Sequence, residues 1–320
     1  MLQKRPSVSL EDAFRGCLLG LAVGDVLGGC FEGQTADYIA RRCPSPQALL
    51  EAPPLETMHY TDDAQMAIGV AEALVADSFI CEATLCRVFA ANYVPSRGYG
   101  FGTRRVLEAM SAGEDHRATA EAYYPGGSFG NGAAMRVAPV GLFFHQDVKR
   151  VREQARLSAL PTHLHPLAIE GAQLLALGVA FAVRAESFDR AIFYEELLTH
   201  CELEDYRRKL ERAAQVSVVD DLAELGNGIQ ALESVVTALA CFALSPEDYG
   251  TAISRAILLG GDTDTIAAMT GALSGAFLGQ QAIPSTLLAR LEDEPQGKGR
   301  SYLTNLADQL WNCRRYEMKE

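Results

Sequence analysis

Helical apolar periodicity runs through most of this chain, and it constrains the fold more than any other feature. Residues 164–183 are apolar on nearly all sides in their second half, which predicts a helix buried at the centre of the molecule. Residues 231–244 and 265–278 are similarly apolar. Alternating apolar and polar residues, which are typical of half-buried strands, are scarce. We therefore predict an all-α fold, a compact globular bundle of many helices.

Local signals predict where some helices begin and where loops lie. Ser9 and Asp12 resemble a capping box at the start of a helix. Glycines recur at four-residue spacing at positions 271, 275 and 279, so this face would let a second helix approach closely. The longer loops are expected near residues 44–59, 111–131 and 292–299.

The composition limits the class of protein. The chain has 320 residues, 48% of them hydrophobic, and no Pro/Gly/Ser-rich linker, so we expect one domain over residues 1–320. The formal net charge of −13 argues against non-specific binding to nucleic acid or to an anionic membrane. No stretch of about 18 uncharged apolar residues indicates a membrane span. We expect a monomer that contacts neither nucleic acid nor membrane.

The eight cysteines are scattered, without a C-x-x-C pair or a zinc-like His/Cys spacing. Such thiols are typical of reduced core residues. The N-terminal residues have no apolar run before Phe14, unlike a secretory signal. We expect an intracellular, reducing compartment, either the cytoplasm or the nucleus, with mitochondria as an alternative.

Two short clusters of Thr and Asp stand at predicted helix entrances, about 200 residues apart in the sequence. The first lies in YTDD and the second in GGDTDT. Together they offer six oxygen-bearing side chains: Thr61, Asp62, Asp63, Asp262, Asp264 and Thr265. Such oxygens are the preferred ligands of Mg²⁺ and Ca²⁺. We interpret the clusters as halves of one metal site at helix N-termini.

Helix capping is the competing interpretation of these clusters, because Asp and Thr are favoured N-caps. For TDD alone, capping is the simpler reading. It is weaker for GGDTDT, because one cap needs one oxygen. Glu32, on a glycine-flanked loop, is a mobile acid or base, a metal ligand or a surface residue. Asp25 lies within an apolar helix and is expected to satisfy backbone donors.

A glycine-rich loop precedes the predicted helix AAMRVAPVGLFF. Its members are Gly126, Gly127, Ser128, Phe129, Gly130, Asn131 and Gly132. Their backbone N–H groups could cradle a diphosphate, although the pattern is not a Walker sequence and a flexible helix entry is the commoner explanation. The rings of Tyr123, Tyr124 and Phe129 could stack on a purine or pack down as a lid. His163 and His165 stand at a helix start, where a histidine is usually structural.

Taken together, these motifs resemble the ADP-ribosyl-acceptor hydrolases, an all-α family that includes the dinitrogenase-reductase-activating glycohydrolases. The likeness spans nearly the whole chain, and YTDD with GGDTDT is highly specific for the family. The combination of GGSFGNGAAMR and ELGNGI is most similar to the ADP-ribosylserine hydrolase subgroup.

The resemblance implies a site that holds two Mg²⁺ ions. One ion would be bound by Thr61, Asp62, Asp63 and Asp264. The other would be bound by Asp262, Asp264 and Thr265. Glu32 would sit on a mobile flap and touch the second ion or the scissile region. The resemblance thus assigns catalysis to Glu32, Asp62 and Asp63.

The resemblance also implies a binding site for ADP-ribose. Residues 126–132 would wrap the diphosphate, with His163 near it. Tyr123 and Ile229 would sandwich the adenine, while Gly100 and Asp62 would contact the distal ribose. The subgroup commonly has Tyr at the position of Phe129 and Phe at that of Tyr123. Residues 186–223 match poorly and look shortened, so acceptor recognition is expected to differ.

The function implied by the resemblance is Mg²⁺-dependent hydrolysis of the O-glycosidic bond between ADP-ribose and an acceptor. ADP-ribosylated serine on a protein or peptide is the expected substrate, which would connect the protein with the DNA damage response. The same chemistry on ADP-ribosylarginine, O-acetyl-ADP-ribose or poly(ADP-ribose) is one alternative. A non-catalytic ADP-ribose-binding or crystallin-like protein and a Mg²⁺-dependent phosphatase are the others.

Overall fold

The computed structural model describes residues 8–51 and 58–317, and in this part of the chain every regular element is a helix. The predicted all-α fold is confirmed. The first half contains α1 (Leu10–Gly29), α2 (Ala36–Arg42), α3 (Pro46–Glu51), α4 (Asp62–Asp77), α5 (Glu82–Asn92), η1 (Pro95–Arg97), α6 (Phe101–Ala112), α7 (His116–Tyr123), α8 (Gly132–Met135), α9 (Ala138–Phe143) and α10 (Val148–Ala159). The second half contains α11 (Pro166–Arg184), α12 (Arg190–Thr199), α13 (Glu204–Gln215), η2 (Val219–Leu225), α14 (Ala231–Leu244), α15 (Tyr249–Leu258), α16 (Thr263–Leu278), η3 (Gln280–Ala282), α17 (Ser285–Leu288) and α18 (Arg300–Glu317).

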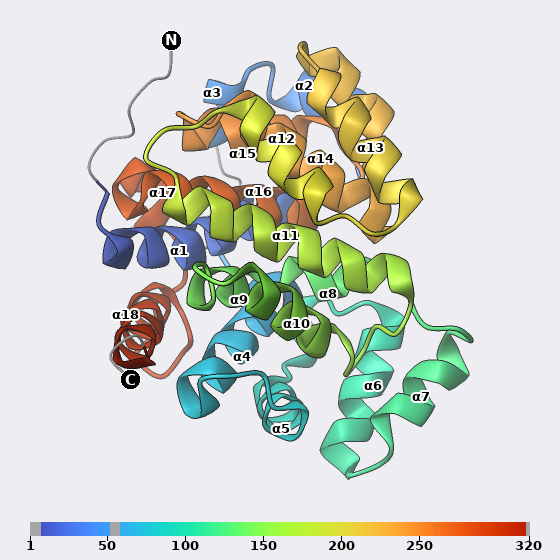
Figure 1. Ribbon diagram of the computed structural model, residues 1–320. Coiled ribbons are helices and arrows are strands. Elements are labelled where there is room, and N and C mark those ends of the chain that lie inside the picture. Colours follow the sequence, from blue (N-terminus) through green and yellow to red (C-terminus); the bar gives the residue numbers. More distant parts are fainter. Residues whose placement is uncertain (1–7, 52–57, 318–320) are drawn as a thin grey trace.

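Helix α11 crosses the middle of the molecule, with α12–α16 on one side and α4–α10 on the other (Figure 1). The starts of α4 and α16 therefore come from opposite sides of this division. Helix α11 is long and apolar enough to cross a membrane by length and composition alone, but 78% of its apolar stretch is buried inside the protein. This burial is what a core helix shows, as residues 164–183 predicted.

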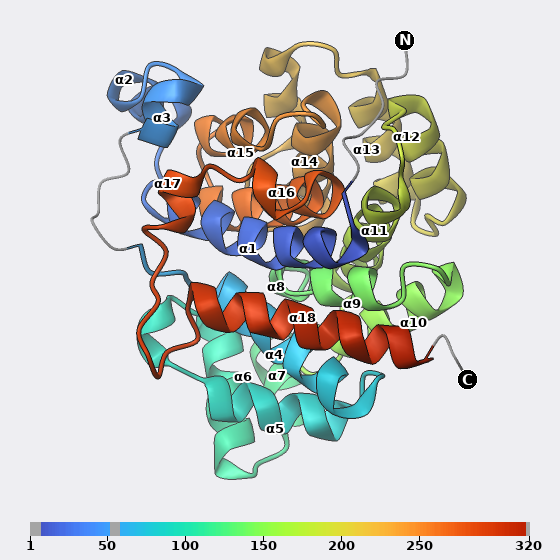
Figure 2. The same cartoon turned by 90° about the vertical axis from the view of Figure 1, so that its left-hand side faces the viewer.

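Helices α1 and α16 lie side by side (Figure 2), in backbone contact through glycines. A Cβ atom built on Gly275 would lie 1.9 Å from the Gly16 carbonyl oxygen, and one on Gly20 would lie 2.4 Å from that of Gly271. Because any side chain would separate the two backbones, glycine is required here. The close approach expected from the glycine spacing is confirmed at Gly271 and Gly275. It is also seen at Gly279, whose carbonyl carbon would lie 2.5 Å from a Cβ atom on Gly16, and Gly279 ends α16 with φ +80°.

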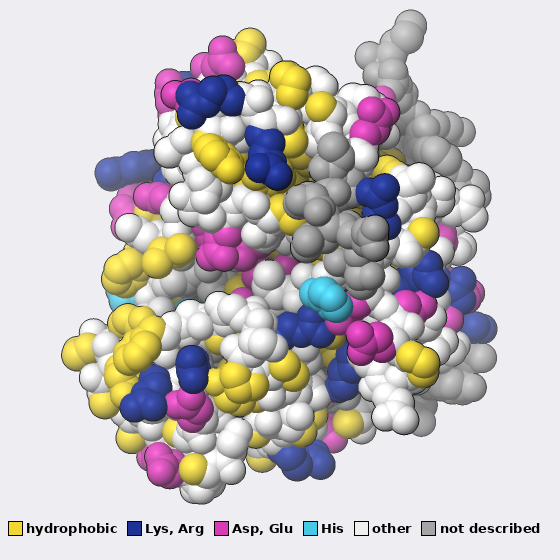
Figure 3. Space-filling model, turned by 180° about the vertical axis from the view of Figure 1, so that it is seen from behind, with side chains coloured by type: hydrophobic (Ala, Val, Ile, Leu, Met, Phe, Trp, Pro, Cys, Tyr) yellow, Lys and Arg dark blue, Asp and Glu magenta, His cyan; other side chains and the backbone are white. Residues whose placement is uncertain are grey.

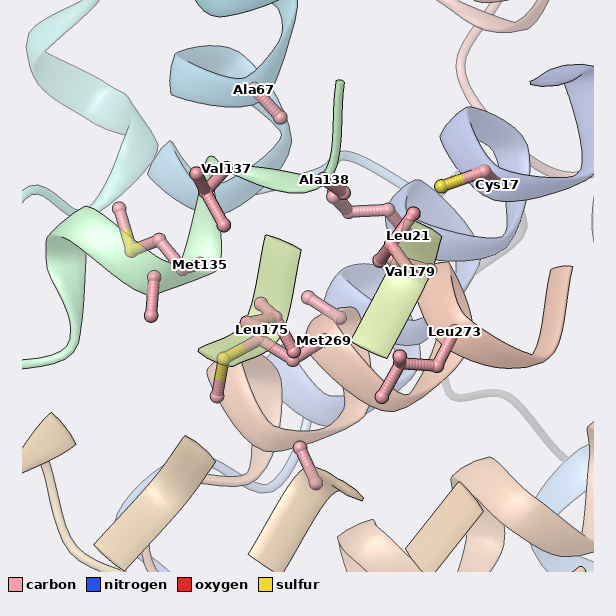
Figure 4. Close-up of a cluster of buried hydrophobic side chains, with 14 of the residues drawn as sticks. Cys17, Leu21, Ala67, Met135, Val137, Ala138, Leu175, Val179, Met269 and Leu273 are labelled. Carbon is pink, nitrogen blue, oxygen red and sulfur yellow. The ribbon is translucent and has the colours of Figure 1, made fainter. Parts of the chain in front are cut away.

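The core between α1, α11 and α16 is apolar and buried. Figure 4 shows Leu175 and Val179 of α11 near Met269 and Leu273 of α16, with Leu21 of α1 beside them. All five side chains are almost completely buried. This packing determines where the N-terminus of α16 lies.

Several local predictions are confirmed and others are wrong. Ser9 accepts a hydrogen bond from the backbone N–H of Asp12, as the capping signal predicted. Residues 292–299 form a loop. The predicted loops at 44–59 and 111–131 contain α3 and α7, although residues 52–57 lie outside the described part. The helix expected from AAMRVAPVGLFF is broken into α8 and α9, because Pro139 has no N–H to bond to the carbonyl of Met135 at the end of α8.

Candidate active site

The two acidic clusters meet in space. Thr61 is the N-cap of α4, and Asp262 is the N-cap of α16. The hydroxyl of Thr265 donates to Asp63 Oδ2 at 3.4 Å, and the hydroxyl of Thr61 donates to the same oxygen at 3.2 Å. Side chains from both ends of the chain therefore converge on one carboxylate.

A cavity of about 260 Å³ opens beside this contact. The predicted site residues that line it are Glu32, Thr61, Asp62, Asp63, Gly100, Ser128, Gly130, Asn131, Gly132, His163, Ile229, Asp262, Asp264 and Thr265. On the face seen in Figure 3, acidic side chains gather in a groove between the upper and lower halves of the molecule. The cavity thus has an acidic end and a wall formed by the glycine-rich loop.

The acidic end fits a hard cation. Oxygen atoms of Glu32, Asp262 and Asp264 lie within 4.8 Å of one another. Asp63 Oδ1 is buried and has no hydrogen-bond partner among the described residues. Asp262 occupies the N-cap position of α16, yet its side chain makes no capping hydrogen bond. Capping therefore does not explain this carboxylate, and an all-oxygen donor set suits Mg²⁺ or Ca²⁺.

The carboxylates at this end repel one another in a poorly solvated place. Burial, followed by repulsion from neighbouring aspartates, holds the pKa values of Asp62 and Asp63 well above their usual range. Burial and then the charge of Asp262 raise the pKa of Asp264 to about 7. The charge of Asp264, followed by burial, raises the pKa of Glu32. A bound cation would remove the repulsion and keep these groups ionised.

Asp25 holds the start of α4 in place from behind. Its fully buried carboxylate accepts hydrogen bonds from the backbone N–H groups of Thr61 and Ala64, both at 3.0 Å. Burial, then the nearby Asp264, raises its pKa to about 7. The expectation that Asp25 satisfies backbone donors is confirmed, and the donors belong to the segment predicted to bind the metal.

An ion pair that the sequence did not reveal supports the same segment from the other side. Glu292 accepts a hydrogen bond from the backbone N–H of Tyr60 at 3.0 Å. Arg97 pairs with Glu292, donates to the Tyr60 carbonyl at 2.7 Å and lies 3.9 Å from the centroid of the Tyr60 ring. The YTDD turn is therefore fixed by contacts from three separate parts of the chain.

The turn before α16 is hydrogen-bonded to the loop that contains Glu32. Gly260 and Gly261 have φ values of +71° and +76°, which favour glycine. The backbone N–H of Gly261 donates to Gln34, and that of Gly33 donates to Gly261. Glu32 itself is exposed at the mouth of the cavity. Its position is thus set by the segment that carries Asp262.

The glycine-rich loop is joined to the acidic end and to the second GNG sequence. The side-chain amide of Asn131 donates to Asp262 Oδ2. The Asn131 N–H donates to Ile229 at 3.0 Å, and the Ala231 N–H donates to Phe129 at 3.1 Å. The first GNG sequence therefore lies beside residues 229–231, directly after the second, which the short motifs could not predict.

His163 completes the wall of the cavity. Its Nδ1 lies 2.7 Å from the Thr162 hydroxyl. A Cβ atom on Gly132 would come within 2.8 Å of the His163 ring, so glycine leaves room for the imidazole. Burial, then the nearby Arg136, lowers the pKa of His163 to about 3. The ring is therefore neutral at physiological pH. His165, by contrast, is the N-cap of α11.

Comparison with known proteins agrees with this geometry. The family model described as ADP-ribosylglycohydrolase matches residues 6–319. The chain belongs to the ADP-ribosylglycohydrolase family.

Proteins called ADP-ribosylhydrolase ARH3 are among its relatives. Those from Gallus gallus and Homo sapiens are 37% and 34% identical, over 85% of this chain and 86% and 87% of theirs. A solved structure titled "ADP-ribosylglycohydrolase-related protein complex" matches with a TM-score of 0.74 and 28% identity, over 95% of this chain and 99% of that chain. The protein is thus a hydrolase that acts on ADP-ribose glycosidic bonds.

Four residues predicted for an ADP-ribosylglycohydrolase site do not line the cavity: Tyr123, Gly126, Gly127 and Phe129. The Tyr123 hydroxyl instead accepts a hydrogen bond from Arg105 at 2.9 Å. The ring of Phe129 packs edge-on against His165, with 5.8 Å between centroids.

The two glycines shape the loop. Gly126 and Gly127 have φ values of +83° and +89°, and a Cβ atom on Gly127 would lie 2.4 Å from the backbone nitrogen of His165. Tyr124 lines the cavity where Tyr123 was predicted to do so.

Proposed function

We propose that this protein is a Mg²⁺-dependent hydrolase that cleaves the O-glycosidic bond between ADP-ribose and a serine side chain of a protein, and releases ADP-ribose. The proposal rests mainly on the contact between Thr265 and Asp63 Oδ2, next to the glycine-rich loop, which leaves the buried Asp63 Oδ1 without a partner among the described residues. We further propose that it works as a monomeric single domain in a reducing intracellular compartment, without direct contact to nucleic acid or membrane. All eight cysteines are free thiols, which supports the compartment.

Two Mg²⁺ ions would be held by the six oxygen ligands and Glu32. Thr61, Asp62, Asp63 and Asp264 would bind one ion. Asp262, Asp264 and Thr265 would bind the other. When bound, such ions act as Lewis acids and can fix the neighbouring hydroxyls of a ribose. The donor set supports this assignment because it contains oxygen atoms alone.

The side chains of the acidic end would stabilise the reacting ribose. Glycoside hydrolysis passes through a state with positive charge on the sugar ring. Ionised carboxylates of Asp62 and Asp63 would face that charge. Glu32 lies at the mouth of the cavity, so its carboxylate would take the proton of the attacking water and pass it to the leaving serine oxygen.

The loop wall would bind the rest of ADP-ribose. The hydroxyl of Ser128 and the backbone between Gly130 and Gly132 would hold the diphosphate. A neutral His163 would add a hydrogen bond without adding charge. Ile229 and, in place of Tyr123, Tyr124 would flank the adenine, because both line the cavity.

The proposal that the linkage is to serine rests on the motifs GGSFGNGAAMR and ELGNGI. A direct test uses a serine-ADP-ribosylated peptide and an arginine-ADP-ribosylated peptide, each with Mg²⁺, with EDTA, and with Mg²⁺ restored after EDTA. Mass spectrometry should show release of ADP-ribose from the serine peptide only when Mg²⁺ is present.

Other outcomes would favour the alternatives. Cleavage of the arginine peptide alone would contradict the acceptor, and full turnover in EDTA would contradict the metal. Binding of ADP-ribose without cleavage of any linkage, including O-acetyl-ADP-ribose and poly(ADP-ribose), would favour a non-catalytic protein. Release of phosphate would favour a phosphatase.

A further inference from the structure

A second cluster of metal-binding side chains lies outside the cavity, between α5 and α7. Glu82 and Cys86 are one helical turn apart on α5, and His116 is the first residue of α7. His116 Nε2 lies 3.6 Å from Cys86 Sγ and 3.1 Å from Glu82 Oε1. The three potential ligand atoms all lie within 4.8 Å of one another, and all three residues are half-buried.

A hydrogen bond or ion pair between His116 and Glu82 accounts for one of these contacts and leaves the Cys86 sulfur as a second neighbour of the same nitrogen. A single imidazole nitrogen faces both the sulfur and the carboxylate oxygen. A neutral imidazole nitrogen either donates or accepts, so it cannot donate to Glu82 and also accept from the Cys86 thiol. A cation between the three atoms would use a lone pair from each of them.

The two separations from His116 Nε2 are close to those of a tetrahedral zinc site. With Zn–S near ~2.3 Å and Zn–N or Zn–O near ~2.0–2.1 Å, tetrahedral angles place S and N about 3.6 Å apart, and N and O about 3.3 Å apart. Cys86 and His116 fit the first separation, and His116 and Glu82 come close to the second. A mixed sulfur, nitrogen and oxygen set favours Zn²⁺ over Mg²⁺ or Ca²⁺.

We propose that Glu82, Cys86 and His116 bind one Zn²⁺ ion, with water in the fourth position. On binding, the Cys86 S–H bond breaks, a Zn–S bond forms and the proton leaves to solvent. Arg117 donates hydrogen bonds to both oxygens of Glu82. It would orient the carboxylate from outside the coordination sphere, as neighbouring groups do in other metal sites.

The zinc would fasten one wall of the ADP-ribose cavity. His116 begins α7, Ala120 lies one turn further along, and Tyr124 follows the end of the helix. Both Ala120 and Tyr124 line the cavity. The ion would therefore hold the start of a helix whose other end shapes the site. The proposal does not depend on the substrate or on Mg²⁺.

Metal analysis of the full chain tests the site. Metal-stripped protein is mixed with a slight excess of Zn²⁺ and a large excess of Mg²⁺, desalted and analysed by inductively coupled plasma mass spectrometry. The Mg²⁺ competes for the oxygen site. Wild type should retain one Zn²⁺ per chain more than Cys86→Ser or His116→Ala. Cys313→Ser and His200→Ala, at other half-buried positions, should retain as much zinc as wild type.

Equal zinc contents in wild type and Cys86→Ser, or no zinc in wild type, would overturn the proposal. A variant that failed to fold would lose zinc for another reason, so melting is compared in zinc-free buffer, where Cys86→Ser should match wild type. Cobalt supplies a second readout. Wild type with Co²⁺ should show a thiolate-to-metal charge-transfer band that Cys86→Ser lacks, and absence of that band in wild type would also overturn the site.

Discussion

The two ends of the cavity differ in how deeply their side chains are buried. At the acidic end, Asp63, Asp262 and Asp264 are 1%, 7% and 5% exposed. At the rim, Ile229 and Tyr124 are 71% and 42% exposed. Side chains at the acidic end are fixed by helix starts and buried hydrogen bonds, whereas those at the rim meet solvent. In the proposed function, the residues that bind the metal would thus be constrained by the fold, while those that recognise nucleotide and acceptor would lie on a surface that can change without unfolding the protein.

The largest effect is expected from Asp264→Asn, which breaks the acidic end. Asp264 is the carboxylate assigned to both ions, so the variant should lose at least about 100-fold in activity. Its stability in metal-free buffer should equal or exceed that of wild type, because a buried repulsive charge is removed. Turnover measures the loss of activity, and thermal melting measures the change in stability. The exposed Asp37→Asn is the control, and wild-type activity in Asp264→Asn would contradict the assignment.

Asp25→Ala should have the next largest effect, although Asp25 does not line the cavity. Without this carboxylate, the N–H groups of Thr61 and Ala64 lose their acceptor, and the first turn of α4 shifts. We expect about 10- to 100-fold weaker Mg²⁺ binding, as for other residues that support metal ligands. Calorimetry measures the affinity, and unchanged binding would show that α4 needs no such support.

The acidic end should make its own contribution to the pH dependence of stability. The pKa values of Asp25 and Asp264 are about 7 in the folded protein, against about 3.9 for an unfolded aspartate. Between these values the two carboxyl groups bind more protons in the folded state, so their contribution to stability should fall as pH rises from about 4 to 7, by about 1.4 kcal/mol per pH unit for each extra proton. The lowered pKa of buried His163 acts in the opposite direction. Denaturation in EDTA at several pH values measures this slope.

Two changes should flatten the slope. Asp264→Asn removes one of the titrating groups, and saturating Mg²⁺ keeps the carboxylates ionised. A slope in EDTA that neither change affects would place the titrating groups elsewhere in the protein.

The smallest effect is expected at the rim, where two adjacent tyrosines provide a matched pair. Tyr124 lines the cavity, whereas Tyr123 bonds to Arg105 outside it. Tyr124→Ala should raise the KM about 2- to 10-fold through loss of ring contacts, with little change in kcat. Tyr123→Ala should change the KM less. Steady-state kinetics decides, and the reverse order would restore Tyr123 as the adenine contact.

Prediction from the sequence succeeded where a pattern was long and strong. Residues 231–244 were expected as a helix and form α14 with the same bounds, because an apolar run of that length has few alternatives. Helix α7 was missed because it is short and mostly polar. Its signal was Asp115, which accepts hydrogen bonds from two N–H groups of the first turn.

The site was predictable in its chemistry but not in its geometry. The sequence indicates which oxygens can bind a hard cation, but only folding brings Asp63 to Thr265. The sequence does not show which of Tyr123 and Tyr124 lines the cavity, because one residue at a helix end turns a side chain by about 100°. The cluster of Cys86 and His116 has no recognisable spacing, because its members come from two helices.

Crystals soaked in Mn²⁺ test the central claim most directly, because Mn²⁺ prefers the same oxygen ligands as Mg²⁺ and its anomalous scattering locates each ion. We predict two peaks about 3.5–4 Å apart, between the side chains of Asp63 and Asp264. Soaked crystals with no peak at this position, or with Asp63 and Thr265 out of contact, would contradict the account.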